Sequence, residues 1–454
     1  MFDNNSSAKL NKILSSKYYK ALDWASFAVA LIGSCAAMYY LFSRQVHTDG
    51  ETYMSDILPY ISEMMGRETQ FDFPYPVLFK TGHLIAVLIY NPEIAMAITV
   101  MLFQALGMII TKVVLNKQTG ARLLSTFCTL GLFFDSMIFS DFFKQFGIRY
   151  HYEGVMSSNP WHNATYMAAR PFMILAFVLG AATLVRYEKE LVKKVNTEPY
   201  HVIEDGKIDL VEAPAALKRF LSEYGLYVGF TASLLLATMS KPSYTIIHMA
   251  AAGIIMVWRF VACHFKNFRQ TLLMGVCYIP TIIALLYQYS GVFTGQGADS
   301  VERGIGFGIG RVWGQYTTNI PLALLLGAAF PFVALLFHLK DLKTDAQYRF
   351  GWQVYLAATV MALVLYEKGF REWHFNFGWG YICGLFIVFM ISAVVVLRDT
   401  LALFGLKTCQ ESPTIQTNKI LFALKLILQW SVFGVHILMG LRYFQLLCWG
   451  ANYM

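Results

Sequence analysis

The chain places acids, a histidine and a tyrosine close together just after its first long apolar stretch. His47, Asp49, Glu51 and Tyr53 fall within seven residues of one another. A carboxylate held beside a helix end can act as a general base toward a hydroxyl group, or can bind a divalent metal. Acids in this position are also often ordinary solvated loop residues. Because these side chains occur together, we expect Asp49 and Glu51 to be catalytic.

Several Lys and Arg residues stand where they could bind a phosphate. Lys241 lies between two apolar segments with almost no loop, which pins its ammonium at a membrane interface. Arg303 and Arg311 flank alternating glycines in 304–310, whose amides could approach a phosphate, although the ending of a P-loop is missing. Arg170 lies inside an apolar segment, where a charge is costly unless it faces a cavity or partner. The alternatives are interfacial anchoring, a flexible loop and snorkelling, respectively.

Aromatic rings alternate with polar groups between Tyr366 and Tyr381. Rings that stack on sugars, beside side chains that bind hydroxyls, favour a carbohydrate site, whereas an aromatic belt would explain the rings alone. The polar stretch 143–164 adds further candidates. The predicted substrate-binding residues are Arg149, His151, His162, Arg170, Lys241, Arg303, Arg311, Arg371, His374 and Asn376.

The composition shows what must position these side chains. The 454 residues are 57% hydrophobic and 14% charged, whereas soluble domains are about a quarter charged. We therefore expect an all-α, polytopic helical membrane protein. The net charge of +8 comes from cations in short loops and does not indicate a nucleic-acid partner. The seven cysteines are scattered, which argues against a disulfide framework or a cysteine metal site. A divalent metal at the acids fits the pattern, but no ligand set identifies one.

About eleven segments are long and apolar enough to cross a bilayer. They are 22–43, 94–115, 121–142, 165–186, 223–240, 243–261, 270–290, 317–338, 351–367, 378–397 and 420–447. Threaded in order, they place most of the lysines and arginines in the loops of one side, which the positive-inside rule makes cytoplasmic. The apolar stretch 76–91 would reverse this pattern if it spanned. We therefore expect it to lie in the outer interface or to re-enter.

This threading fixes the expected organisation. Residues 1–21 form a cytoplasmic tail that leads into a signal anchor, and 22–454 form one integral membrane domain. The domain carries an outer loop at 44–93, with interfacial helices, and a cytoplasmic insertion at 187–222. The N terminus is expected inside and the C terminus outside, in the plasma membrane.

The pattern resembles the GT-C superfamily of polytopic glycosyltransferases, such as the protein mannosyltransferases and the aminoarabinose transferases. The likeness rests on a long first outer loop with Asp49 and Glu51 after the first span, and on Phe73-Pro74-Tyr75-Pro76-Val77-Leu78-Phe79, which is similar to a proline-rich stretch of that family. No clear second acidic motif follows, and there is no large soluble C-terminal domain. The resemblance implies an isoprenoid-phosphate sugar donor, an inverting transfer, and Asp49 as base or metal-contacting residue.

The sequence therefore predicts a membrane glycosyltransferase or glycan-assembly enzyme that uses a polyprenyl-phosphate-linked sugar at the outer face. The expected partners are membrane lipid, that donor, and a glycan, lipid or protein acceptor. Two alternatives stay open. One is a polysaccharide polymerase or ligase of the O-antigen type, which would depend on outer-loop arginines. The other is a lipid-linked glycan transporter or flippase without catalysis, whose polar residues should lie near mid-membrane.

Overall fold

The computed structural model describes residues 16–47, 55–67, 69, 73–149, 156–196, 213–294, 304–406 and 419–450. Helices dominate these residues, and the two strands form one short antiparallel pair. The long helices are α2 (Lys17–Val46), α4 (Pro76–Ile89), α5 (Pro92–Thr119), α6 (Arg122–Phe134), α7 (Ala164–Asn196), α8 (Ala213–Ser240), α9 (Ser243–Ala262), α10 (Phe268–Thr294), α15 (Ala346–Val364), α16 (Asn376–Leu403) and α17 (Lys419–Cys448). The short elements are α3 (Ile57–Met64), η1 (Asp141–Phe146), β1 (Ile305–Phe307), α11 (Trp313–Tyr316), α12 (Ile320–Gly327), α13 (Ala329–Phe337), α14 (Asp341–Thr344), β2 (Leu365–Glu367) and η2 (Gly369–His374).

Seven helices in the described ranges are long and apolar enough to span a membrane, and eight if one bent pair counts as a span. The seven lie in α2, α5, α7, α9, α10, α16 and α17. The expected count of about eleven is therefore not confirmed, although every predicted segment overlaps at least one helix. The multi-pass helical class is what these apolar helices support.

Two of the predicted spans that are not among the seven are interrupted helices. Within the predicted span 121–142, helix α6 stops at Phe134 after 13 residues and an extended segment follows. Within the predicted span 317–338, α12 and α13 meet at Ala328 with a bend of 74°. Helix α4, within the stretch expected at the interface, has 14 residues, fewer than the twenty or so that a span requires.

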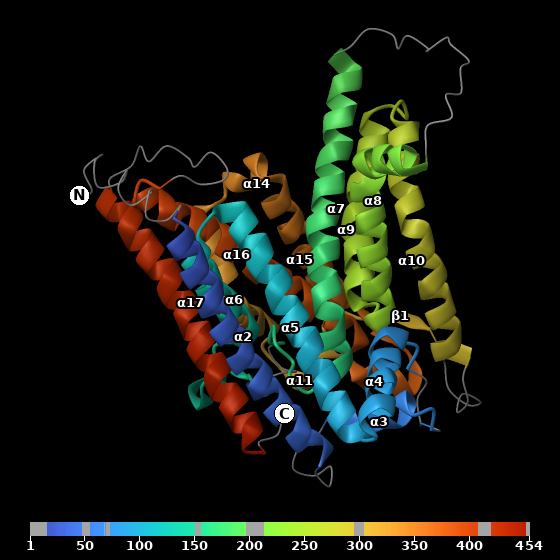
Figure 1. Ribbon diagram of the computed structural model, residues 1–454, viewed down its shortest axis with the longest axis vertical. Helices are drawn as coiled ribbons and strands as arrows, with labels where there is room; N and C mark the ends of the chain where they lie inside the picture. The colour runs from blue at the N-terminus through green and yellow to red at the C-terminus, as the bar shows by residue number, and fades with distance from the viewer. Residues whose placement is uncertain are drawn as a thin grey trace.

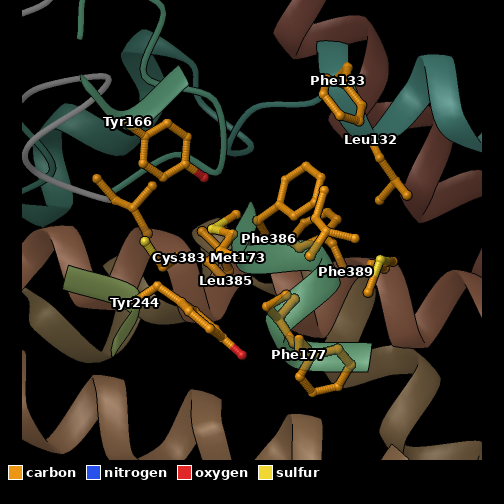
Figure 2. Packing of buried hydrophobic residues seen from close by; sticks show 14 of the residues in the cluster. Leu132, Phe133, Tyr166, Met173, Phe177, Tyr244, Cys383, Leu385, Phe386 and Phe389 are labelled. Carbon is orange, nitrogen blue, oxygen red and sulfur yellow. The ribbon is translucent and has the colours of Figure 1, made fainter. Parts of the chain in front are cut away.

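The core is built around α16, whose apolar window is completely buried. Figure 2 shows side chains of α6, α7, α9 and α16 converging in this core, among them Phe133, Tyr166, Phe177, Tyr244 and Phe386. A helix that is apolar on every side can be buried on every side, which explains the central position of α16. By contrast, α10 and α17 expose long apolar faces, as lipid-facing helices do.

Buried polar contacts satisfy the backbone where α6 ends. The side-chain Nδ2 of Asn159 donates to the backbone carbonyls of Leu132 and Asp135 at 3.1 and 3.0 Å, and to the Asp135 carboxylate at 2.6 Å. Ser158 donates to the same carboxylate. Non-helical backbone inside a helix bundle is stable only when its polar groups find partners. Asn159 therefore acts as a cap that closes α6.

His436, on α17, contacts both places where a helix is interrupted, namely the segment after α6 and the start of α13. The amide of Phe330, near the start of α13, donates to His436 Nε2 at 3.2 Å, so this nitrogen is the acceptor. The other nitrogen, Nδ1, lies 2.7 Å from the carbonyl of Ser136 and must donate. His436 is thus a neutral imidazole that uses both nitrogens to hold two chain interruptions against one helix.

One end of the bundle gathers the segments that carry polar candidates. Helices α3 and α4 lie there, near the N-terminal end of α7 (Figure 1). Strand β1 is at the level of the lower ends of α8 and α9 in the same view. The opposite end carries α14 and the far end of α7 (Figure 1). We call the first of these the Lys241 end, because Lys241 joins α8 to α9 there.

Candidate polar site at the Lys241 end

Lys241 is held in place by the tight connection between two helices. Helix α8 ends at Ser240 and α9 begins at Ser243, and the Lys241 amide still donates to the Ala237 carbonyl at 2.8 Å. Pro242 precedes α9, where its fixed φ is compatible with the entry into a helix. The residue is only 7% exposed, so the connection directs a cation inward.

The Lys241 ammonium is surrounded by neutral groups. Its Nζ donates to Asn163 Oδ1 at 3.3 Å and to Thr165 Oγ1 at 3.1 Å, and lies 3.9 Å from the ring centroid of Trp379. In the described part of the chain, no carboxylate lies within 4.0 Å of this Nζ. Burial lowers the pKa of Lys241 to about 8, and the negative charge of Asp56 opposes this shift.

Asn163 connects the cation to the segment that precedes α3. Its Oδ1 accepts from the Tyr166 amide at 2.9 Å, which makes Asn163 the cap of α7. Its Nδ2 donates to the Tyr60 hydroxyl at 3.0 Å and approaches Asp56 Oδ2 at 3.5 Å. One buried side chain thereby links Lys241 to an acid at the residue before α3.

Among the acids of the polar stretch after α2, Asp56 is within the described residues and lies close to Asn163. It precedes α3, is exposed, and accepts a hydrogen bond from the Tyr60 hydroxyl at 3.2 Å. It belongs to the same polar stretch as Asp49 and Glu51. Those two predicted catalytic residues lie outside the described residues, so their roles stay predictions.

The rings of His162 and Tyr166 also lie close to the ring of Trp379. The ring centroids of His162 and Trp379 are 5.9 Å apart, and those of Tyr166 and Trp379 are 6.2 Å apart. Burial, followed by the charge of Lys241, lowers the pKa of His162 to about 3. His162 is therefore neutral, as packing beside a cation requires. Among the described residues, no group of three His, Cys, Asp or Glu side chains is placed to hold a metal ion.

A second polar group lies where β2 leads into α16. Glu367 Oε2 accepts from Arg371 Nε at 3.0 Å and from Asn376 Nδ2 at 2.8 Å. The Arg371 and Glu367 side chains are 17% and 13% exposed. His374 is exposed at the end of η2, between Arg371 and Asn376 in sequence. The positive charge of Arg371 is thus already offset by a neighbouring carboxylate.

Arg311 has its own partner. Its guanidinium contacts both oxygens of Glu372, at 2.7 and 3.2 Å, and lies 4.5 Å from the ring centroid of Tyr366. A bidentate pair of this kind fixes the orientation of the guanidinium. Arg149 is exposed and belongs to another loop, while His151 and Arg303 lie outside the described residues.

Arg170 is far from solvent and packs among rings. It is 1% exposed, and its guanidinium lies 4.8 to 5.3 Å from the ring centroids of Phe133, Tyr166 and Phe386, three side chains labelled in Figure 2. Its NH1 donates to Gln104 Oε1 at 3.4 Å. The aromatic faces stabilise this cation inside the core.

The structure therefore groups some of the predicted residues and separates others. It brings together Lys241 and His162, with Arg371, His374 and Asn376 on the segment that leads into α16. Sequence reasoning gave no site role to Asn163 or Glu367, whereas Trp379 belongs to the aromatic stretch that was expected to stack on a sugar. An Asn before an apolar helical segment is a capping signal, and that signal could have identified Asn163. No protein-family model and no curated protein matches this chain.

Proposed function

We propose that the protein is a membrane glycosyltransferase or glycan-assembly enzyme that uses a polyprenyl-phosphate-linked sugar donor at the outer face of the membrane. The observation that carries this proposal is the buried ammonium of Lys241, which has neutral partners and an aromatic ring. A buried charge without a counter-charge costs several kcal/mol. A donor phosphate beside Lys241 would offset that cost with a charge-assisted hydrogen bond.

The surroundings of Lys241 suit the rest of such a donor. Trp379 offers a large ring on which a sugar or prenyl chain can stack. Asn376 and His374 are on the segment that leads into α16 and could contact hydroxyl groups. A phosphate at an interface between bilayer and water also leaves its prenyl chain in the hydrocarbon, as a lipid-linked substrate requires.

The acids of the first outer loop supply the proposed base. Asp49 or Glu51 would remove the proton from the acceptor hydroxyl, and the carboxylate would need to face the sugar carbon opposite the leaving phosphate. Asp56, from the same loop, lies close enough to Lys241 to raise its pKa. This proximity supports the assignment of the loop to the same site as the cation.

A transfer assay tests this proposal. The purified protein in proteoliposomes is given polyprenyl-phosphate hexoses together with glycan, lipid or protein acceptors, and both the glycosylated acceptor and the released polyprenyl phosphate are measured. We expect release by wild type and at least a hundredfold loss in Asp49→Asn or Glu51→Gln, in line with the contribution of general base catalysis of about 10²–10⁴. Lys144→Ala, on an exposed ion pair with Asp141, is the control and should retain activity. Full activity in both acid variants would refute the assigned base.

One observation favours the transporter alternative. The bend of 74° between α12 and α13, together with the early end of α6, places interrupted helices inside the bundle. Interrupted helices often line transport pathways. Uptake of a lipid-linked glycan without any covalent product would select this function. For the polymerase or ligase alternative, Arg311 is a weaker anion ligand than expected, because Glu372 already offsets its charge.

A further inference from the structure

Three large apolar side chains project from the strand region near the Lys241 end. We call Ile305, Phe307 and Ile309 the apolar ridge. Strand β1 pairs with β2 in antiparallel register, with Ile305 opposite Glu367 and Phe307 opposite Leu365. Alternate residues of an extended chain point to opposite faces. The three ridge side chains are 49%, 81% and 84% exposed, whereas Gly306 between them is buried.

The glycines explain why the ridge faces outward. A Cβ at Gly306 would lie 2.4 Å from Tyr366 Cζ, and one at Gly308 would lie 3.1 Å from Arg311 Cβ. Tyr366 therefore occupies the glycine face, and Arg311 covers its ring. Larger residues fit only on the opposite face, which is the one that carries the ridge.

Backbone hydrogen bonds fix the ridge to the end of α15. The amides of Gly308 and Gly310 donate to the carbonyls of Val364 and Leu363 at 2.9 and 2.7 Å. The Lys368 amide donates to the Gly304 carbonyl at 2.8 Å. These hydrogen bonds therefore fix the orientation of the ridge relative to α15.

The ridge continues an apolar surface of the helix bundle. Helix α15, to which it is bonded, exposes Leu356 (63%) and Val360 (47%), one turn apart. Figure 1 shows β1 beside the lower ends of α8 and α9, where the chain leaves the apolar helices. Apolar side chains at this level, continuous with exposed helix faces, fit the boundary between hydrocarbon and headgroups.

We propose that the apolar ridge inserts into the bilayer leaflet on the Lys241 side, with lipid acyl chains as its partner. Insertion removes three large side chains from water and uses no binding pocket. Because β2 leads through η2 into α16, the ridge would also hold the segment of Glu367 and Arg371 at the membrane surface. This inference does not depend on the reaction that the protein catalyses.

Fluorescence quenching in nanodiscs tests the insertion. Phe307→Cys and Ile309→Cys are made in a background with the native cysteines replaced by Ser or Ala, and each is labelled with an environment-sensitive fluorophore. The full chain is used, and its thermal melting confirms folding. Leu286→Cys on α10, which is 64% exposed on a candidate span, is the lipid control. Lys343→Cys, exposed on α14, is the water control.

We expect doxyl-labelled lipid to quench the two ridge probes at least half as strongly as the Leu286 probe, and iodide to quench them several-fold less than the Lys343 probe. Quenching by iodide equal to that of the Lys343 probe, without quenching by lipid, would overturn the proposal. Protection from both quenchers, with a dimer in native mass spectrometry, would also overturn it and assign the ridge to a second copy.

Discussion

The Lys241 ammonium lies 3.9 Å from the centre of the Trp379 ring, with Asn163 and Thr165 as its hydrogen-bond acceptors. Lys241 comes from the connection between α8 and α9, whereas Trp379 is in the first turn of α16. The contact between these two residues therefore ties three helix ends together around one positive charge. Its two hydrogen-bond acceptors are neutral side chains, which is the reason for proposing that an anion binds there.

Removing this charge should not destabilise the protein. Lys241→Met keeps the length and apolar stem of the side chain but removes a buried cation that has no carboxylate within 4.0 Å among the described residues. Replacing a buried charge with an apolar group is often neutral or stabilising. We expect a melting temperature equal to or above that of wild type, measured by intrinsic fluorescence in detergent. A fall of more than about 2 °C, which corresponds to about 2 kcal/mol in a protein of 454 residues, would mean that Lys241 is a structural cation.

Asn163→Ala should behave in the opposite way. The substitution removes the cap of α7 and the link between Tyr60 and Lys241. Losing a capping side chain costs about 0.5–2 kcal/mol, and the buried hydroxyl and ammonium also lose a partner. The melting temperature should therefore fall. Asn163→Asp, which keeps the cap and adds a negative charge, is the control and should melt closer to wild type.

Anion affinity should depend on pH near 8. Burial lowers the pKa of Lys241 to about 8, so the ammonium is charged below this pH and neutral above it. Affinity for a short-chain prenyl phosphate should fall as pH rises through about 8, while Lys241→Met should show no such transition. The contribution of Lys241 to protein stability changes with pH in the opposite direction. Because the unfolded state keeps its proton up to about 10.5, the contribution of Lys241 to the free energy of unfolding rises between about 8 and 10.5.

Asp56 should set the position of that transition. Its negative charge raises the pKa of Lys241 and so opposes the effect of burial. Asp56→Asn should therefore move the loss of anion affinity to lower pH, measured with the same prenyl phosphate titration. An unchanged midpoint would show that Asp56 does not act on Lys241. Glu93→Gln, a change at an exposed acid on α5 that pairs with His47, is the control.

Gly440 should be essential for the closure of α6. A Cβ on Gly440 would lie 1.9 Å from the Phe134 carbonyl oxygen and 2.6 Å from the Asp135 carbonyl carbon. Gly440→Ala must displace that backbone, at a cost of about 1–3 kcal/mol or more. Gly434→Ala, on the same helix with no atom within 4 Å of the added Cβ, is the matched control. We expect a clear loss of thermal stability in the first variant and an unchanged or higher value in the second, because alanine favours a helix.

The helical class could be predicted from the sequence because long apolar runs leave few alternatives. The count of spans could not. Residues 121–142 have the hydropathy of one span, yet Asp135 and Ser136 interrupt it and find buried partners on the segment 156–163. Such partners come from residues more than twenty positions away in sequence, so an average of hydropathy over a local window does not detect them. In the segment 317–338, Gly327 and Pro331 flank the break and were available as local signals.

The candidate site could be predicted only in part. Lys241 stood out because its short connection leaves little freedom. The partners that decide its chemistry, Asn163 and Trp379, come from two other helix starts and meet it only in three dimensions. The expected phosphate ligands Arg311 and Arg371 have carboxylate partners, and both of these acids lie within four residues of Arg371 in sequence. For Arg371, the acid four residues before it was an available signal of pairing, whereas Glu372 lies 61 positions from Arg311 and gave no local signal for that arginine.

Native mass spectrometry of polyprenyl phosphate binding tests the proposed donor site most directly. Wild type is compared with Lys241→Met, Arg371→Ala and Asp49→Asn, and the uncharged polyprenol is the control ligand. We expect wild type and Asp49→Asn to bind the phosphate, and Lys241→Met to bind at least about tenfold more weakly, which corresponds to about 1.4 kcal/mol. Equal binding by wild type and Lys241→Met, or no preference of wild type for the phosphate over the alcohol, would contradict the site.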